Sequence, residues 1–363
     1  MAIEEVDAGS ELDERSIVDP AIEIRNAKVT YDEGESYVLD DVSIDLDRNE
    51  VLGVVGESGS GKSMFASSLL DSVPDPGVLT GRITYHPRDG EPIEVLDLSK
   101  EELRELRWEE ISMVFQGAMS SFNPVLKVRT HFEETLEAHD ANVAEGMDFA
   151  RELLSDLYLD PDRVLDAYPH ELSGGMTQRA LIALSMVLNP EVLVMDEPTA
   201  ALDLLMQRSI LQLLEDLQAK YDISLVFITH DLPLIAALAD RMAIMYAFRF
   251  VEVAPTQDLV ANAAHPYTRM LLNSTPNLDA PLAEMKPIEG QSPAPINLPS
   301  GCAFHPRCPL AEEQCMQSEP DYHDVSDRQG ARCFRWEAAQ AQILLNYEDM
   351  LEDRGTSGGD ADE

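Results

Sequence analysis

The chain carries a glycine-rich loop of the kind that binds nucleotide phosphates. The segment GESGSGKS, residues 56–63, fits the pattern G-x-x-x-x-G-K-[ST] and stands between an apolar strand pattern and the start of a helix. Its backbone N–H groups can wrap phosphate oxygens, Lys62 can reach the β- and γ-phosphates, and the Ser63 hydroxyl can hold Mg²⁺. The residues predicted to contact a nucleotide are Gly56, Glu57, Ser58, Gly59, Ser60, Gly61, Lys62 and Ser63. Such a loop alone also suits a kinase, a GTPase or a helicase.

A pair of carboxylates follows a second apolar strand pattern, VLVM. Asp196 is placed to hold Mg²⁺ through water, and Glu197 to orient and polarise an attacking water. Phosphoryl transfer depends on in-line positioning and charge neutralisation more than on covalent chemistry. Together with the loop, the pair predicts nucleotide hydrolysis, although an isolated Asp-Glu pair after a strand is more often a solvated cap.

The only four cysteines of the chain are gathered near its C-terminal end. They are Cys302, Cys308, Cys315 and Cys333. Four thiols within a short segment, after none before it, favour a shared metal, and thiolates suit iron–sulfur clusters or zinc. Their spacing is wider than that of zinc fingers, and reduced, inert thiols are the remaining alternative.

Strand and helix patterns alternate in the segments that must position these groups. Strands are expected at 21–31, 42–46, 50–56, 82–86, 111–115, 192–195, 224–229 and 241–246, and helices at 61–70, 129–190, 205–218 and 232–239. This order predicts a parallel sheet with crossover helices, interrupted by a helical insert. After about residue 275 the chain becomes proline-rich and irregular.

The composition is strongly acidic. Asp and Glu number 68 against 26 Lys and Arg, which gives a formal charge of -42 over 363 residues. This charge repels nucleic acid and anionic lipid, so we expect no nucleic acid partner. Acid-rich surfaces with few lysines resemble those of halophiles that accumulate salt, so we expect a halophilic archaeal source; the alternative is one unusually acidic protein from an ordinary cell. No apolar stretch is long enough to span a membrane, and the acidic N-terminus lacks a signal-peptide pattern.

The chain resembles the ABC ATPases in its further motifs. Leu172-Ser173-Gly174-Gly175-Met176 matches the signature of that family and precedes a helix pattern. The resemblance implies that two ATPase domains enclose two ATP molecules, so that Ser173, Gly174 and Gly175 act in trans on nucleotide held by a partner.

The same resemblance assigns roles to four more positions. Gln116 matches the Q-loop glutamine, a Mg²⁺ ligand together with Ser63 and Asp196, and His230 matches the switch histidine beside the γ-phosphate. Asp203 matches the D-loop, and Tyr31 the aromatic residue that stacks on adenine, with Tyr37 as its alternative.

A closer similarity is to the oligopeptide, dipeptide and nickel importer ATPases of the LSGGM subtype. The segments that carry it are GESGSGKS, FQGAMSSFNPV, PHELSGGMTQR, DEPTAALD, HPYTRMLL and GCAFHPRCP. The similarity implies a [4Fe-4S] cluster on the four cysteines, with zinc as the alternative. It also implies a related ATPase subunit as heterodimer partner, two membrane permease subunits and, indirectly, an extracytoplasmic solute-binding protein. Thr177, Gly117 and Phe248 depart from the pattern, and none of the three replaces a catalytic group.

These observations predict an α/β P-loop NTPase with a mixed, mostly parallel sheet, an antiparallel β subdomain, a helical insert and a small metal-binding extension. We expect a disordered acidic lead at 1–20, the ATPase domain at 21–275 with its insert at about 117–175, the extension at 276–340 and an acidic tail at 341–363.

The expected location is the cytoplasmic face of the membrane, where the chain would be bound through the permease. Peptides are the default solute, with nickel and sugars open. A soluble ABC ATPase acting on DNA or ribosomes would need coiled-coil heptads or a basic stripe, and a small-molecule kinase would not need LSGGM.

Overall fold

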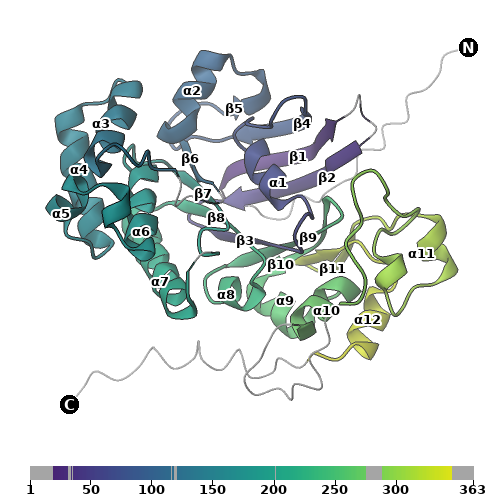
Figure 1. Ribbon diagram of the computed structural model, residues 1–363. Helices are drawn as coiled ribbons and strands as arrows, with labels where there is room; N and C mark the ends of the chain where they lie inside the picture. Colours follow the sequence, from purple (N-terminus) through teal and green to yellow (C-terminus); the bar gives the residue numbers. More distant parts are fainter. Residues whose placement is uncertain are drawn as a thin grey trace, which may run out of the picture.

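The computed structural model describes residues 19–31, 34, 36–115, 117, 121–200, 202–274 and 288–345. Two sheets lie at its centre, a four-stranded antiparallel sheet and an eight-stranded mixed sheet (Figure 1). The expected acidic lead and tail fall largely outside the described residues, as does the expected boundary near residue 275. At the C-terminal end, the last helix continues to Gln342, beyond the position where the tail was expected to begin.

Five parallel strands form the centre of the larger sheet. Their order is β9-β3-β8-β7-β6, and the pairs along this row are all parallel. They comprise β3 (Val51–Val55), β6 (Ile111–Val114), β7 (Val192–Asp196), β8 (Ser224–Thr229) and β9 (Arg241–Tyr246). Strands β3, β7 and β8 are buried along their whole length, because helices and the second sheet cover both faces of a parallel sheet.

The smaller sheet has the order β2-β1-β4-β5 and covers one face of the larger one. Its strands are β1 (Pro20–Tyr31), β2 (Ser36–Asp47), β4 (Val78–Tyr85) and β5 (Ile93–Glu94). Apolar side chains of β1, β2 and β4 share one core with α1 (Lys62–Ser68) and α2 (Lys100–Glu109). A capping box between Ser99 and Glu102 begins α2 and satisfies two backbone donors at its N-terminus.

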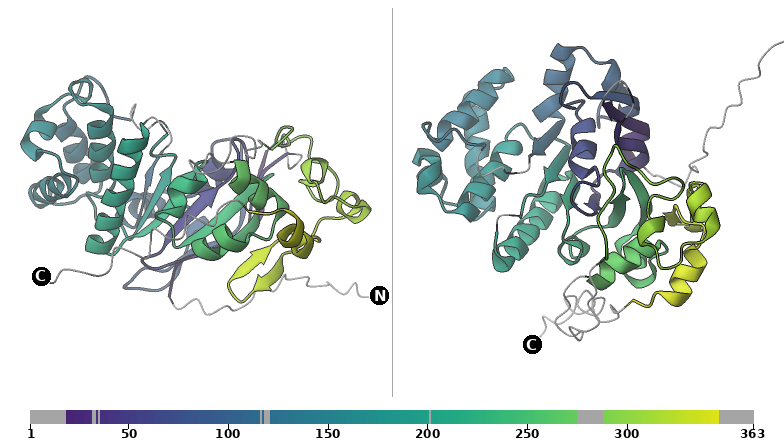
Figure 2. Two further views of the ribbon diagram at one scale, coloured as in Figure 1. Left: turned by 90° about the horizontal axis from the view of Figure 1, so that it is seen from below. Right: turned by 45° about the vertical axis from the view of Figure 1, so that its right-hand side comes forward.

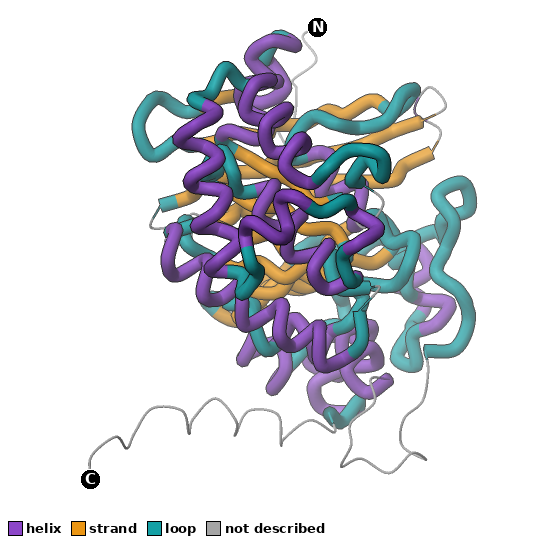
Figure 3. Tube along the Cα trace, turned by 60° about the vertical axis from the view of Figure 1, so that its left-hand side comes forward, coloured by secondary structure: helices purple, strands orange, loops and turns teal. Residues whose placement is uncertain are grey.

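A group of helices projects beyond the β6 edge of the larger sheet. It contains α3 (Val128–Ala138), α4 (Val143–Asp156), α5 (Pro161–Asp166) and α6 (Gly174–Ser185). Leucine and alanine side chains spaced by three and four residues form its interior, which is continuous with the core under the sheet. Figure 3 shows these helices in front of the orange strands. Two further helices, α7 (Leu204–Tyr221) and α8 (Leu232–Ala236), connect the parallel strands.

The C-terminal segment lies at the opposite end of the molecule and continues the larger sheet. Strand β10 (Arg249–Pro255) pairs antiparallel with β9, and the hairpin β11–β12 (His323–Ser326 and Gln329–Ala331) extends the sheet beyond β10. Four short helices surround this edge, α9 (Thr256–Asn262), α10 (Pro266–Ser274), α11 (Glu313–Gln317) and α12 (Trp336–Gln342). Figures 1 and 2 show this yellow-green region on the side away from α3–α5. Among the described helices, none combines the length and apolar character needed to cross a bilayer.

Candidate nucleotide-binding site

The glycine-rich loop connects β3 to α1, as the sequence predicts. Gly61 is the N-cap of α1 and has a φ of 109°, a left-handed conformation that an L-residue adopts only with strain. A side chain at Gly56 would collide with the carbonyl oxygen of Met245 in β9. The loop therefore needs glycine at these two positions for backbone conformation and for close packing.

Lys62 lies across the loop that precedes it. Its Nζ donates to the carbonyl oxygens of Gly56 at 2.8 Å and of Glu57 at 3.0 Å. Burial lowers the pKa of the Lys62 ammonium, and the charges of Glu197, Asp196 and Glu57 oppose that shift. A buried cation beside the loop and near two carboxylates is placed to meet an anionic ligand.

Asp196 ends β7 beside the loop. Burial raises the pKa of the Asp196 carboxyl, against an opposing hydrogen bond from Ser63. Its Oδ1 atom is buried and makes no hydrogen bond within the described residues. A hydroxyl and a carboxylate oxygen without a partner are hard oxygen donors of the kind Mg²⁺ takes, so Ser63 and Asp196 fit a magnesium site.

Glu197 and His230 come together from neighbouring strands. Glu197 follows β7, has a φ of 49°, and its backbone N–H donates to Ile228 in β8 at 2.9 Å. His230 follows β8, and its Nδ1 lies 3.3 Å from Glu197 Oε1. The side chain of His230 is 61% exposed and that of Glu197 is 16% exposed, so the imidazole lies at the surface and covers part of the carboxylate at the carboxyl end of the sheet. This is where a water could be oriented toward a bound phosphate.

The signature segment is built on a different helix terminus. Ser173 is the N-cap of α6 and accepts a hydrogen bond from the N–H of Met176 at 3.4 Å. Asp203 caps α7 in the same way, with Oδ1 accepting from Met206 N–H at 3.0 Å. A side chain at Gly175 would collide with Met206, so the two helix N-termini are neighbours. Within the described residues, no hydrogen bond joins 173–175 to 56–63.

Comparison with known proteins agrees with this arrangement. The family described as "ABC transporter" matches residues 39–200, and the family described as "Oligopeptide/dipeptide transporter, C-terminal region" matches residues 251–315. The dipeptide transport ATP-binding protein DppD of Caldanaerobacter subterraneus is 42% identical over 308 residues, which cover 84% of this chain and 93% of that protein. The oligopeptide transport ATP-binding protein OppD of Escherichia coli K12 is 38% identical over 83% of this chain and 89% of that protein. The chain belongs to the ATP-binding subunits of oligopeptide and dipeptide ABC transporters.

A solved structure supports the same fold for this ABC ATPase. The dimeric structure of MJ0796, described as a bacterial ABC transporter cassette, matches with a TM-score of 0.55 and 28% identity. The match covers 65% of this chain and 98% of the chain of MJ0796. The expected P-loop NTPase fold is thus confirmed, and the chain is an ABC-type ATPase.

The described contacts do not assign a nucleotide-binding role to the predicted adenine-stacking residue Tyr31 or to its alternative Tyr37. The Tyr31 hydroxyl donates to Pro74 O at 3.1 Å, and its ring packs on the turn at Gly77. The ammonium of Lys28 lies 5.1 Å from the ring centroid of Tyr37, the alternative residue. Gln116 lies outside the described residues.

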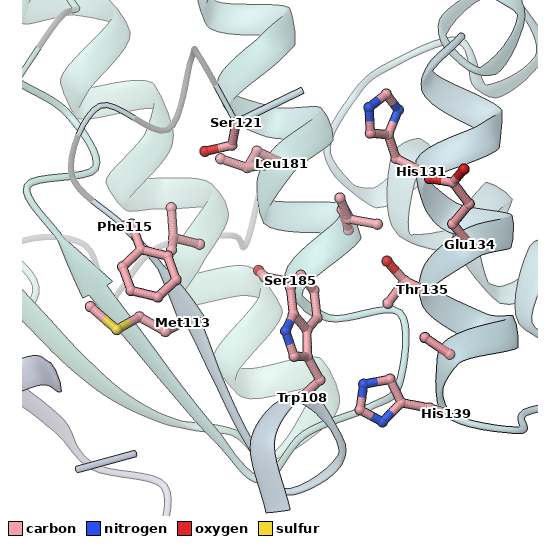
Figure 4. Close-up of a pocket in the computed structure, with 13 residues that line it drawn as sticks. Trp108, Met113, Phe115, Ser121, His131, Glu134, Thr135, His139, Leu181 and Ser185 are labelled. Carbon is pink, nitrogen blue, oxygen red and sulfur yellow. The ribbon is translucent and has the colours of Figure 1, made fainter. Parts of the chain in front are cut away.

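A cavity of about 330 Å³ lies between α2, β6, α3 and α6. Figure 4 shows His131, Glu134 and Thr135 along one wall, from α3, and Met113 and Phe115 opposite them. Phe115 is 53% exposed, which is unusual for a large apolar residue. The cavity therefore presents apolar surface between the sheet and the helical insert of the ABC ATPase.

The four cysteines of the ABC ATPase line one small cavity together with His305. All four are free thiols. Burial raises the pKa of Cys308 to about 11 and that of Cys333 to about 12, so the thiolate forms need a nearby cation. Among the described residues, no three His, Cys, Asp or Glu side chains are spaced as ligands of one metal ion.

Tyr267 contacts the phosphate loop but was not predicted from the sequence as a site residue. The Tyr267 hydroxyl in α10 accepts a hydrogen bond from Glu57 N–H at 3.0 Å. Tyr267 stands in the segment HPYTRMLL, which carried the family similarity, but no local pattern links it to residues 56–63.

Proposed function

We propose that this ABC ATPase couples MgATP binding and hydrolysis to the uptake of peptides through a membrane permease. The observation that carries the proposal is the meeting of Lys62, Asp196, Glu197 and His230 at the carboxyl ends of β3, β7 and β8. The peptide substrate is supported by the family and by relatives named for dipeptide and oligopeptide transport.

In this proposal each group has one task. The N–H groups of residues 56–63 and the Lys62 ammonium bind the phosphates, and Tyr31 stacks on the adenine. Ser63, Asp196 and Gln116 would hold Mg²⁺, which would supply positive charge to the phosphates. Glu197, oriented by His230, positions the attacking water in line with the γ-phosphate.

A second ATPase subunit completes the site. We propose that Ser173, Gly174 and Gly175 bind the γ-phosphate of nucleotide held by the partner, with Asp203 crossing the same interface. Leu204 and Leu205 beside Asp203 are exposed by 60% and 80%, which supports a contact surface here. A heterodimer with a related subunit is our proposal, consistent with LSGGM.

The permease is the proposed route to the membrane. We assign its contact to the cavity beside Phe115, and place the chain on the cytoplasmic face. Co-purification with permease subunits expressed in the same cells is the expected result. Recovery of the permease without this chain would contradict the assignment.

We further propose a [4Fe-4S] cluster on Cys302, Cys308, Cys315 and Cys333, supported by the one cavity that all four line. Protein purified without exposure to air should contain about four irons and four sulfides per chain. One zinc and no iron would make the extension a zinc module. Protein that contains neither iron nor zinc would contradict a metal-binding role for the cysteines.

A salt-rich cell interior is a further proposal, supported by the charge of -42 and by a lysine count of six within the 26 basic residues. The salt dependence of the stability of the protein tests this proposal.

The direct test of the nucleotide site uses Lys62→Ala. Removing the ammonium should weaken MgATP binding by about a hundredfold, measured with a fluorescent ATP analogue. Lys220→Ala is the matched control, since Lys220 is an exposed lysine in α7 paired with Glu152 and Asp156. Equal affinity in the two variants would refute the proposed phosphate loop.

A further inference from the structure

The second residue of the glycine-rich loop, Glu57, is bound by the C-terminal part of the chain. Arg307 donates to its carboxylate from both terminal nitrogens, Nη1 to Oε2 at 2.7 Å and Nη2 to Oε1 at 2.9 Å. The Ser292 hydroxyl donates to the same carboxylate, and the Glu57 N–H donates to Tyr267. These partners follow Glu57 by 210 to 250 residues, so the loop is attached to a distant segment.

Arg307 is held rigidly for this contact. Its Nε donates to the carbonyl oxygen of Glu289 at 2.9 Å, and its guanidinium lies 5.8 Å from the ring centroid of Tyr246 and 5.9 Å from that of Phe304. The side chain is only 7% exposed. A planar guanidinium held on several sides makes the two-bond contact with a carboxylate that a lysine would not reproduce.

The backbone of Glu57 also contacts two other residues of the glycine-rich loop. Its carbonyl oxygen accepts hydrogen bonds from Lys62 Nζ at 3.0 Å and from Ser60 N–H at 3.2 Å. Burial alone would raise the pKa of the Glu57 carboxyl, but the hydrogen bonds from Arg307 and Ser292 hold the pKa below its ordinary value. Glu57 is therefore an anion in the loop that must receive a triphosphate, and an unpaired carboxylate there would repel the ligand.

We propose that Arg307 is a positioning residue for nucleotide binding, which neutralises and orients the Glu57 carboxylate so that the loop accepts the triphosphate. The inference rests on the proposed role of residues 56–63 as the phosphate loop. Arg307 ends the turn His305–Arg307, between Cys302 and Cys308. The fold of the cysteine-containing segment is thereby connected to the nucleotide site.

The test compares the affinity of the full chain for a fluorescent ATP analogue with Mg²⁺ in Arg307→Gln, Glu57→Gln and the double variant. Arg307→Gln leaves the carboxylate without its cation and should weaken binding about tenfold. Glu57→Gln removes the negative charge and leaves Arg307 without its anion, and it supplies the second single variant of the cycle. Adding Glu57→Gln to Arg307→Gln should recover most of the lost affinity, because neither charge then remains.

Arg328→Gln is the matched control, because Arg328 lies in the same segment but pairs with exposed Asp258, away from the loop. Thermal unfolding without nucleotide shows whether each variant is folded. A lower midpoint with unchanged affinity in Arg307→Gln would overturn the proposal. The proposal would also be overturned if the double variant bound the analogue as weakly as Arg307→Gln does. The loss of affinity would then not be caused by the charge of Glu57. Retained binding in Lys62→Ala would instead refute the phosphate loop itself.

Discussion

At the scale of single residues, the candidate site depends on groups kept in unusual states. Glu197 has a left-handed backbone that costs free energy for any residue with a side chain, and such strain is often retained where it places a functional group. Within the part of the chain that the structure describes, one buried oxygen of Asp196 makes no hydrogen bond, and burial lowers the pKa of the Lys62 ammonium. A ligand that meets Asp196 and Lys62 would offset the cost of burying these two groups.

Replacing Glu197 by Gln separates binding from hydrolysis. The amide keeps the size of the side chain but cannot polarise water, so MgATP affinity should be unchanged while phosphate release falls about a hundredfold or more. Binding is measured with the fluorescent analogue and turnover by released phosphate. Glu191→Gln, at the opposite end of β7, is a control outside the proposed site. Undiminished turnover in Glu197→Gln would assign the water-orienting role to another group.

At the scale of elements, the C-terminal segment is fixed to the ATPase sheet by buried polar contacts. Glu252 in β10 is fully buried and accepts hydrogen bonds from Ala264 N–H at 2.6 Å, His265 N–H at 2.9 Å and Gln329 Nε2 at 2.8 Å. One carboxylate thus joins β10, the start of α10 and β12. Burial raises its pKa, against the hydrogen bonds that favour the charged form.

Glu252→Ala tests this junction. The change leaves two backbone N–H groups and one amide without their acceptor, and each buried unpaired donor costs about 1–3 kcal/mol. The free energy of unfolding should fall by about 3 kcal/mol or more, measured by denaturant titration. Asp258→Ala, which breaks an exposed pair with Arg328 in the same region, should cost less than about 1 kcal/mol. Equal effects in the two variants would contradict the role of Glu252.

At the scale of the whole molecule, the acidic surface sets the conditions for stability. A formal charge of -42 on 363 residues opposes compactness through repulsion among exposed carboxylates. Several of the basic residues that are present are used in long-range pairs, such as Arg241 with Glu50 and Arg48 with Glu191. The remaining repulsion is reduced chiefly by dissolved ions.

Raising KCl from about 0.1 M to about 1 M shortens the Debye length from about 10 Å to about 3 Å. The midpoint of thermal unfolding should rise by several degrees over this range. Sucrose at equal osmolality is the control, since it is excluded from the surface without screening charge. If sucrose raised the unfolding midpoint as much as KCl does, charge repulsion would not be the cause of the increase.

The sequence by itself determined the positions of those side chains that are set by the local order of strand, turn and helix. Residues 56–63, the pair Asp196-Glu197 and the cap at Ser173 were predictable, because a strand, a turn and a helix in succession fix where their side chains stand. The parallel strands were predictable for the same reason, as short apolar runs between helix patterns.

Only the tertiary structure decided what lies across the molecule. The addition of β11 and β12 to the ATPase sheet, the burial of Glu252 and the pairing of Arg307 with Glu57 join segments that no local periodicity relates. Such contacts come from the closing of long loops around a shared core, and one sequence carries no pattern that names their partners. The place of the glycine-rich loop between β3 and α1 was therefore readable in the sequence, whereas its attachment to the C-terminal segment was not.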